Sequence, residues 1–181
     1  MRIISLGIDC SIAYQLINHE NTNYYRSPFD WIYSENLNDV IKLIDNKFDG
    51  FLDFNNYNIV NCDSNKFGLD DALNEIKFSN FIMKHKYYKI RLPHELYDIS
   101  DLYKFKERYS KLIDHFYSLD KLGEQIIFIR LGKNKDYDKL PELEKVLSKY
   151  FNNFVIRFID ISNITTSSWK KNEINWQQLI K

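Results

Sequence analysis

Two apolar segments near the end of the chain, separated by an amphipathic pattern, constrain the fold most strongly. Residues 125–131 read QIIFIRL and residues 153–162 read NFVIRFIDIS, and both runs are typical of buried strands. The segment 138–151 places apolar side chains at helical spacing, namely Leu140, Leu143, Val146, Leu147 and Tyr150. Because the links between these elements are short, the pattern predicts a βαβ unit with parallel strands.

The start of the chain has the same order of strand and helix. Residues 3–6 form an apolar run that ends at Gly7, which predicts a buried strand and a turn. Asp9 can then cap a helix over about residues 10–18. Ser34 can cap a second helix with Leu37, Val40, Ile41 and Ile44 facing inward. The other expected elements are helices over about 70–82, 101–119 and 173–181 and strands over 57–61 and 87–93, the latter ending at Pro93.

These patterns predict an α/β fold. We expect a compact three-layer domain with a mostly parallel, mixed sheet and a C-terminal βαβ unit, in which the middle segment is an insertion or an antiparallel edge. The 181 residues suit one domain, 1–181, with a core over about 2–162 and a tail over 163–181 that ends in a short helix.

Charge and hydropathy exclude several functional classes. Basic and acidic residues balance at 25 each, which gives no support for a nucleic-acid-binding face. The N-terminal apolar run is too short for a signal peptide, and no segment approaches membrane-spanning length. We therefore expect a soluble cytoplasmic protein, with its oligomeric state left open.

The metal and cofactor motifs that can be recognised from spacing are missing from the sequence. Two cysteines do not make a disulfide framework, and the cysteines and four histidines show no CxxC or HxxxH spacing. The segment 131–134, LGKN, lacks the spacing of a nucleotide-binding P-loop. We expect no metal site and no cofactor.

Cys10 follows a strand, a glycine turn and a capping aspartate. That order places it at the N-terminus of a helix, where unpaired N–H groups and the helix dipole favour an anion. A thiol placed there has a lowered pKa and becomes nucleophilic, although the charge of Asp9 opposes this effect. The alternative is that Cys10 is a small apolar residue packed under the sheet.

A cysteine nucleophile needs a base, and His94 is the best placed of the four histidines. It follows a predicted strand and Pro93, at a boundary between elements where functional residues often lie. The alternative is a histidine in a surface loop.

The segment RSPFDW at residues 26–31 packs basic, aromatic and acidic groups around one proline. Asp30 could orient a histidine or cap a turn, and Phe29 and Trp31 could wall a pocket. The alternative is a loop anchored in the core, with both aromatic side chains buried and Asp30 as a cap.

Two arginines lie in the predicted C-terminal strands. A buried or strand-end arginine usually has a carboxylate partner or a bound anion. Arg130 would lie at the carboxyl edge of a parallel sheet, where ligands bind in open α/β sheets. We expect Arg157, inside the last strand, to form a structural ion pair.

Taken together, these segments resemble a known family. ISLGIDCSIAYQL at residues 4–16 and RSPFDWI at 26–32 resemble the opening of the DUF1796 proteins, which are described as papain-like cysteine peptidases. Weaker matches follow at Leu92–Glu95, at Arg108–Tyr109 and at Phe128–Arg130, so that the resemblance covers most of residues 2–160.

The resemblance implies that Cys10 is the nucleophile and His94 its general base, with Asp30 as candidate for the third, orienting member. It also implies an α+β papain-like fold, with the cysteine on a helix and the histidine on an antiparallel sheet, as the alternative to the α/β reading. We expect Ser11, Ser27 and Trp31 to line the site.

Two functions follow. The first is a cysteine-dependent hydrolase or peptidase that acts on a small molecule, glycan or peptide. In this reading N–H groups near Cys10 and Ser11 hold the oxyanion, and Arg26 or Arg130 binds an anionic substrate group. The second is a non-peptidase module, such as a sugar- or nucleotide-processing protein, that binds a phosphate or carboxylate at the helix start over Gly7–Ser11 with help from Arg130.

Overall fold

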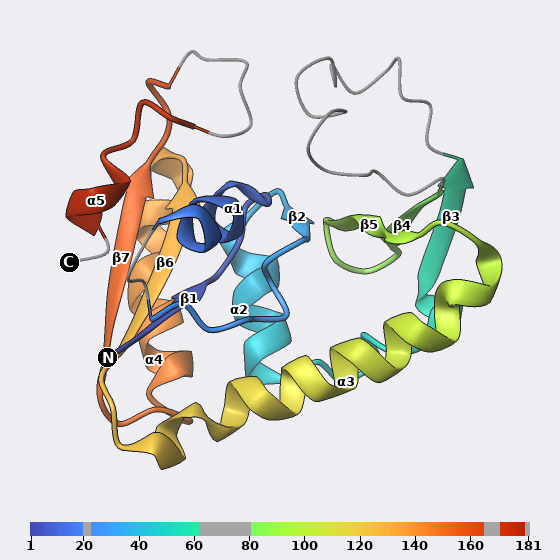
Figure 1. Ribbon diagram of the computed structural model, residues 1–181, viewed down its shortest axis with the longest axis horizontal. Coiled ribbons are helices and arrows are strands. Elements are labelled where there is room, and N and C mark those ends of the chain that lie inside the picture. Colours follow the sequence, from blue (N-terminus) through green and yellow to red (C-terminus); the bar gives the residue numbers. More distant parts are fainter. Residues whose placement is uncertain (20–22, 62–80, 165–170, 180–181) are drawn as a thin grey trace.

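The computed structural model describes residues 1–19, 23–61, 81–164 and 171–179 (Figure 1). Its strands are β1 (Arg2–Ser5), β2 (Tyr33–Ser34), β3 (Tyr57–Asn61), β4 (Phe81–His85), β5 (Ile90–Leu96), β6 (Ile126–Gly132) and β7 (Phe154–Asp160). Its helices are α1 (Ser11–Asn18), α2 (Leu37–Asp45), α3 (Leu102–Ser118), α4 (Leu140–Leu147) and α5 (Trp176–Leu179), with short 3-10 helices η1 (Phe54–Asn56), η3 (Ile99–Asp101), η4 (Leu119–Leu122) and η5 (Asn134–Lys139). Within the described ranges, no helix combines the length and apolar character needed to cross a membrane.

The first sheet is parallel and has the strand order β1-β6-β7. Ile3 pairs with Ile127, which in turn pairs with Val155 on the other side. The expected C-terminal βαβ unit is therefore present as β6, α4 and β7. Since β1 adds to it in parallel, the carboxyl ends of all three strands lie at the same edge of the sheet.

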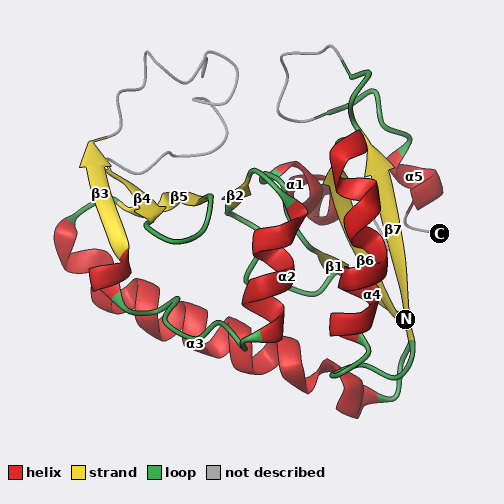
Figure 2. Cartoon of the chain, turned by 180° about the vertical axis from the view of Figure 1, so that it is seen from behind, coloured by secondary structure: helices red, strands yellow, loops and turns green. Residues whose placement is uncertain are grey.

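Alternate side chains of this sheet face two separate hydrophobic clusters. Ile3, Ile127, Ile129 and Leu131 pack with residues of α1 and with Trp176 of α5. Ile4 and Phe128 point to the opposite face and pack with buried residues of α2 and α4. Figure 2 shows α2 and α4 together on that face. The sheet thus lies between two layers of helices, as the α/β prediction requires.

The middle strands form a second sheet, which is antiparallel and has the order β2-β5-β4-β3. We expected one mixed sheet, and the chain instead combines a parallel sheet with an antiparallel one. The long helix α3 passes both sheets (Figure 1). Its Phe105 packs against Tyr57 of the antiparallel sheet, and its Phe116 packs against Phe128 of the parallel sheet. The α/β content with two sheets fits both the α/β and the α+β papain-like description.

Two local predictions are wrong. Asn36, and not Ser34, caps α2, since its side chain accepts a hydrogen bond of 2.9 Å from the Asp39 N–H. The strand β5 does not end at Pro93 but continues to Leu96. Pro93 is tolerated there because β2 is too short to reach it and the pairing with β4 shifts register between Phe81 and Met83. Most of the helix expected over 70–82 lies outside the described residues.

Candidate active site

The turn after β1 has a strained backbone that brings Cys10 to the start of α1. Gly7 has a φ of 77°, and a Cβ atom at this position would lie 3.2 Å from the carbonyl oxygen of Phe29. The next residue, Ile8, has a φ of 117°, a conformation that a β-branched residue rarely adopts. Strain of this kind persists only where the surrounding structure holds it in place, and it often occurs at functional sites.

Arg130 is the group that holds this turn. Its Nη1 donates to the Leu6 carbonyl at 3.0 Å and to Ser34 Oγ at 2.6 Å, while Nη2 donates to the Ser34 carbonyl at 3.2 Å. The Ser34 N–H in turn donates to the Ile8 carbonyl at 2.9 Å. Because Arg130 is fully buried, it is out of a substrate's reach, and the prediction that it binds substrate is wrong.

Arg157, for which we expected a structural ion pair, donates from its guanidinium to the backbone carbonyl of Leu179 and thereby ties the C-terminal helix to β7.

We expected Asp9 to cap α1, but the N-cap residue is Cys10, which makes no side-chain capping hydrogen bond, and the carboxylate of Asp9, one residue earlier, lies at the helix start. Its Oδ1 accepts hydrogen bonds from the Ser11 N–H, at 2.9 Å, and from the Ser11 hydroxyl. Its Oδ2 lies 3.5 Å from Nζ of Lys171. Ser11 is completely buried, and its N–H is already used, so it cannot serve as the oxyanion donor that we expected. The same carboxylate argues against an anionic ligand at this helix start.

The thiol of Cys10 is partly exposed, and its environment keeps it protonated. Burial, followed by the negative charge of Asp9, raises the pKa of Cys10 to about 12, and Lys171 and the Cys10 backbone N–H oppose the shift. The helix start therefore does not give a preformed thiolate, because burial, and after it the charge of Asp9, outweigh the field that would stabilise one.

A cavity of about 320 Å³, the Cys10 cavity, brings Cys10 and His94 together. Most of its wall is apolar and comes from Trp31, Ile32, Tyr33, Ile82 and Pro93, and the wall also includes Asp9 and Arg91. The imidazole of His94 meets the Trp31 indole edge to face, with ring centroids 5.7 Å apart. His94 is placed here by the continuation of β5 past Pro93, and thus lies in a strand and not in a surface loop.

A second cavity, of about 390 Å³, adjoins the first, and we call it the arginine cavity. It shares Trp31 and His94 with the Cys10 cavity, so these two side chains form the wall between them. Its other lining residues are Arg26, Ser27, Asp30, Glu95, Tyr97, Arg108, Tyr109 and Leu112. The structure thus brings five of the predicted site residues to these two cavities besides Cys10, namely His94, Asp30, Arg26, Ser27 and Trp31.

Asp30 is buried in the loop before β2. Its Oδ2 accepts a hydrogen bond of 2.9 Å from the Ser27 N–H, and the Tyr24 hydroxyl lies beside its carboxyl. The Ser27 hydroxyl donates to the Ser5 carbonyl at 2.7 Å, which ties the loop to β1. Burial raises the pKa of Asp30 to about 7, against the opposing effects of Tyr24, Ser27 and Arg26. The role of Asp30 as the member that orients His94 stays a prediction.

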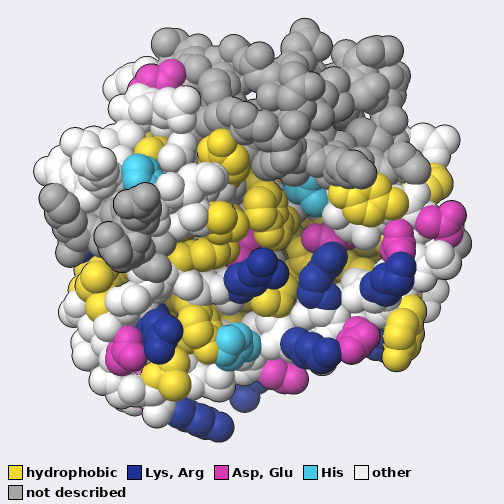
Figure 3. All heavy atoms as spheres, in the orientation of Figure 1, with side chains coloured by type: hydrophobic (Ala, Val, Ile, Leu, Met, Phe, Trp, Pro, Cys, Tyr) yellow, Lys and Arg dark blue, Asp and Glu magenta, His cyan; other side chains and the backbone are white. Residues whose placement is uncertain are grey.

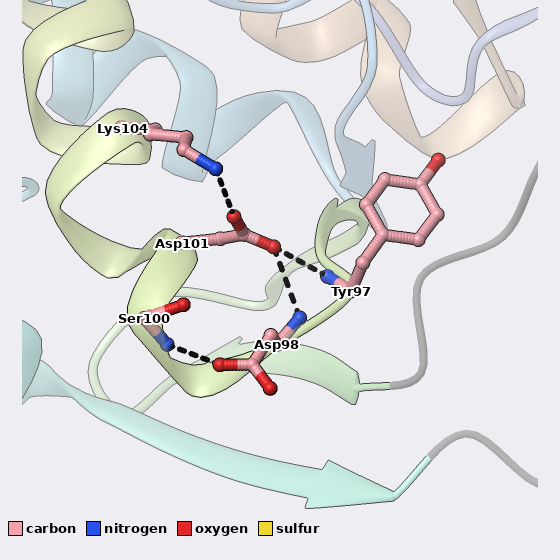
Figure 4. Close-up of polar contacts among 5 residues, drawn as sticks. All are labelled: Tyr97, Asp98, Ser100, Asp101 and Lys104. Carbon is pink, nitrogen blue, oxygen red and sulfur yellow. Dashed lines mark hydrogen bonds and ion pairs between the residues drawn. The ribbon is translucent and has the colours of Figure 1, made fainter.

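The side chains of Glu95 and Arg108 connect β5 to α3, and the sequence had given neither residue a role. Arg108 forms an ion pair with Glu95, and the Tyr109 hydroxyl donates to the same carboxylate at 3.0 Å. The turn between the two elements is fixed by Asp101, whose Oδ2 accepts from the N–H groups of Tyr97 and Asp98 (Figure 4). In the sequence these residues appear only as an acid directly after His94 and as an Arg-Tyr pair in the helix. Nothing in that pattern indicates that Glu95 contacts Arg108 and Tyr109.

The sequence is similar to known proteins over most of its length. A family model described as "Putative papain-like cysteine peptidase (DUF1796)" matches residues 1–164. The chain is 26% identical over 215 aligned residues to the protein named "Uncharacterized protein R408" of Acanthamoeba polyphaga mimivirus, an alignment that covers 98% of this chain and 96% of the viral one. No solved structure is significantly similar to the chain. Because the family model spans nearly the whole sequence, the chain belongs to the DUF1796 family.

Proposed function

We propose that the protein is a cysteine-dependent acyl hydrolase in which Cys10 is the nucleophile and His94 the general base. The observation that carries this proposal is that both side chains line one cavity, although Cys10 directly precedes α1 and His94 lies in β5 of the antiparallel sheet. The family description is consistent with it.

The raised pKa of Cys10 determines how the reaction would begin. At neutral pH the thiol keeps its proton, so His94 removes it as the sulfur attacks the acyl carbon. The bond between the acyl carbon and the leaving group breaks, a thioester forms on Cys10, and the leaving group takes the proton from His94. Water then attacks the thioester with His94 again as base, which releases the acid and returns the proton to the sulfur.

The backbone N–H of Cys10 is the candidate for the oxyanion donor. It lies close enough to its own sulfur to lower the thiol pKa, and so it is next to the position where the acyl oxygen would develop charge. The N–H of Ser11 is taken by Asp9 and is not available for this role.

The test is the rate at which iodoacetamide alkylates Cys10 in a Cys62→Ser background, where Cys10 is the only thiol. We expect His94→Gln to slow alkylation at pH 7.5 by at least about tenfold, because the thiol then loses its base. His115→Gln is the matched control, since His115 lines neither cavity and packs against the Tyr25 ring instead. Equal rates in the two histidine variants would remove His94 from the mechanism.

A further inference from the structure

We propose that the substrate has two chemically different halves, an apolar acyl group bound in the Cys10 cavity and an anionic leaving group bound in the arginine cavity. This inference rests on the proposed acyl transfer and adds the substrate class to it.

The position of the two catalytic side chains gives the direction of the substrate. Cys10 lines only the first cavity, whereas His94 lines both. The carbon that the sulfur attacks therefore lies in the first cavity, and the group that leaves with a proton from His94 departs toward the second. The wall of the first cavity is largely aromatic and aliphatic, which suits an acyl group without charge.

The charged groups that a ligand would meet in the arginine cavity are guanidinium groups. Arg26 is exposed, and half of the Arg108 side chain is exposed. Both acids of this cavity are buried instead, with only 2% of Asp30 and 6% of Glu95 accessible. Glu95 is further occupied by Arg108 and by the Tyr109 hydroxyl.

The net effect is a cavity with N–H donors and positive charge at its accessible surface. The pair with Glu95 uses one edge of Arg108, and a guanidinium has five N–H donors. Burial raises the pKa of Asp30, which weakens the one acid near Arg26. Figure 3 shows several Lys and Arg side chains, with Asp and Glu side chains among them, on one face of the molecule. Carboxylates and phosphates are the anions that such donors bind best.

The test measures binding to Cys10→Ala protein, which cannot turn the ligand over. The probes are N-phenylacetyl-glycylglycine and its methyl ester, which differ only in the negative charge, and N-phenylacetyl-ethanolamine phosphate to distinguish a phosphate from a carboxylate. We expect the acid, the phosphate or both to bind about tenfold more tightly than the ester, and Arg26→Met to abolish that preference without weakening the ester. Lys111→Met, on the exposed side of α3, is the matched control and should leave the preference intact.

Arg26→Met is preferred over a truncation of Arg108, which would leave Glu95 buried without its partner. Equal binding of the two anions and the ester would overturn the inference, and so would an Arg26→Met variant that weakens all three probes alike. Because the measurement uses protein without its thiol, it decides the substrate class independently of whether Cys10 is the nucleophile.

Discussion

Nζ of Lys171 lies 3.5 Å from Oδ2 of Asp9, the residue directly before the candidate nucleophile. Lys171 belongs to the C-terminal segment beyond the part of the chain that the family model matches. The same segment is anchored there by a hydrogen bond of 3.0 Å from Gln15 to Asn172 and by burial of Trp176. The C-terminal segment therefore takes part in setting the electrostatics around Cys10.

This contact predicts opposite effects on the Cys10 thiol from two substitutions. Asp9→Asn removes the negative charge but keeps a side-chain acceptor for the Ser11 N–H, so the pKa of Cys10 should fall and alkylation at pH 8 should accelerate by up to roughly tenfold. Lys171→Met leaves the charge of Asp9 without its partner and should slow alkylation. In Asp9→Asn protein the Lys171 substitution should still slow alkylation, because the positive charge of Lys171 also lowers the pKa of the thiol directly. A Lys171→Met variant that is alkylated as fast as the wild-type protein would show that Lys171 does not tune the thiol.

Arg130 provides a prediction about stability. Arg130→Met leaves the Leu6 carbonyl and the Ser34 hydroxyl buried without their donor, and we expect it to destabilise the fold by roughly 3–5 kcal/mol. Ser34→Ala removes only one of the hydrogen bonds and should cost about 1–2 kcal/mol. Urea unfolding followed by circular dichroism measures both. A loss below 1 kcal/mol for Arg130→Met would contradict the framework role that the structure gives it.

Asp30 predicts a pH dependence of stability. Its pKa is about 7 in the folded protein and ordinary in the unfolded chain, so the folded state binds the extra proton between about pH 4 and pH 7. Stability from this group is thus present at low pH and is lost as pH rises through 7. Asp30→Asn should raise the stability at pH 8 relative to that at pH 5 by up to roughly 3 kcal/mol, which is about 1.4 kcal/mol for each of the two pH units below the folded pKa. The exposed Asp138→Asn serves as control, and identical pH profiles for the two variants would exclude a raised pKa at Asp30.

His85 predicts a pH dependence of stability with the opposite sign to that of Asp30. Burial lowers its pKa, and its Nδ1 accepts hydrogen bonds from the N–H groups of Tyr87 and Tyr88. Below about pH 6.5 the unfolded chain takes up a proton that the folded protein resists. The free energy of unfolding therefore decreases as the pH is lowered through this range. After correction for the intrinsic slowing of exchange at lower pH, these two amides should be less protected from hydrogen exchange at pH 5 than at pH 7, and His85→Asn should remove that loss of protection. Its persistence in His85→Asn would assign the opening to another group.

The sequence predicted those parts of the fold that depend on local patterns. The continuous apolar runs of β6 and β7 indicated buried parallel strands. The cap expected at Asp9 was one residue too early, because Cys10 is the N-cap and the Asp9 carboxylate accepts from Ser11. Two errors came from local competition, since Asn36 is as good a cap as Ser34 and the ladder around Pro93 tolerates a residue without an N–H.

The candidate site was only partly predictable for a different reason. Cys10 and His94 were found from their neighbours in the sequence, but Arg130 and Lys171 act on residues more than a hundred positions away, and no periodicity indicates such a contact. The pKa of the Cys10 thiol could not be predicted from the sequence either. A helix start suggested a lowered pKa, and burial together with Asp9 reversed the sign.

The central claim is that Cys10 becomes acylated and that His94 is needed to remove the acyl group. Intact-mass and peptide mass spectrometry after mixing with p-nitrophenyl phenylacetate tests it most directly. The account predicts a phenylacetyl thioester on Cys10 that disappears within the time course in the wild-type protein and persists in His94→Gln. An acyl group found on other residues but never on Cys10, or a Cys10 adduct with the same lifetime in both proteins, would contradict it.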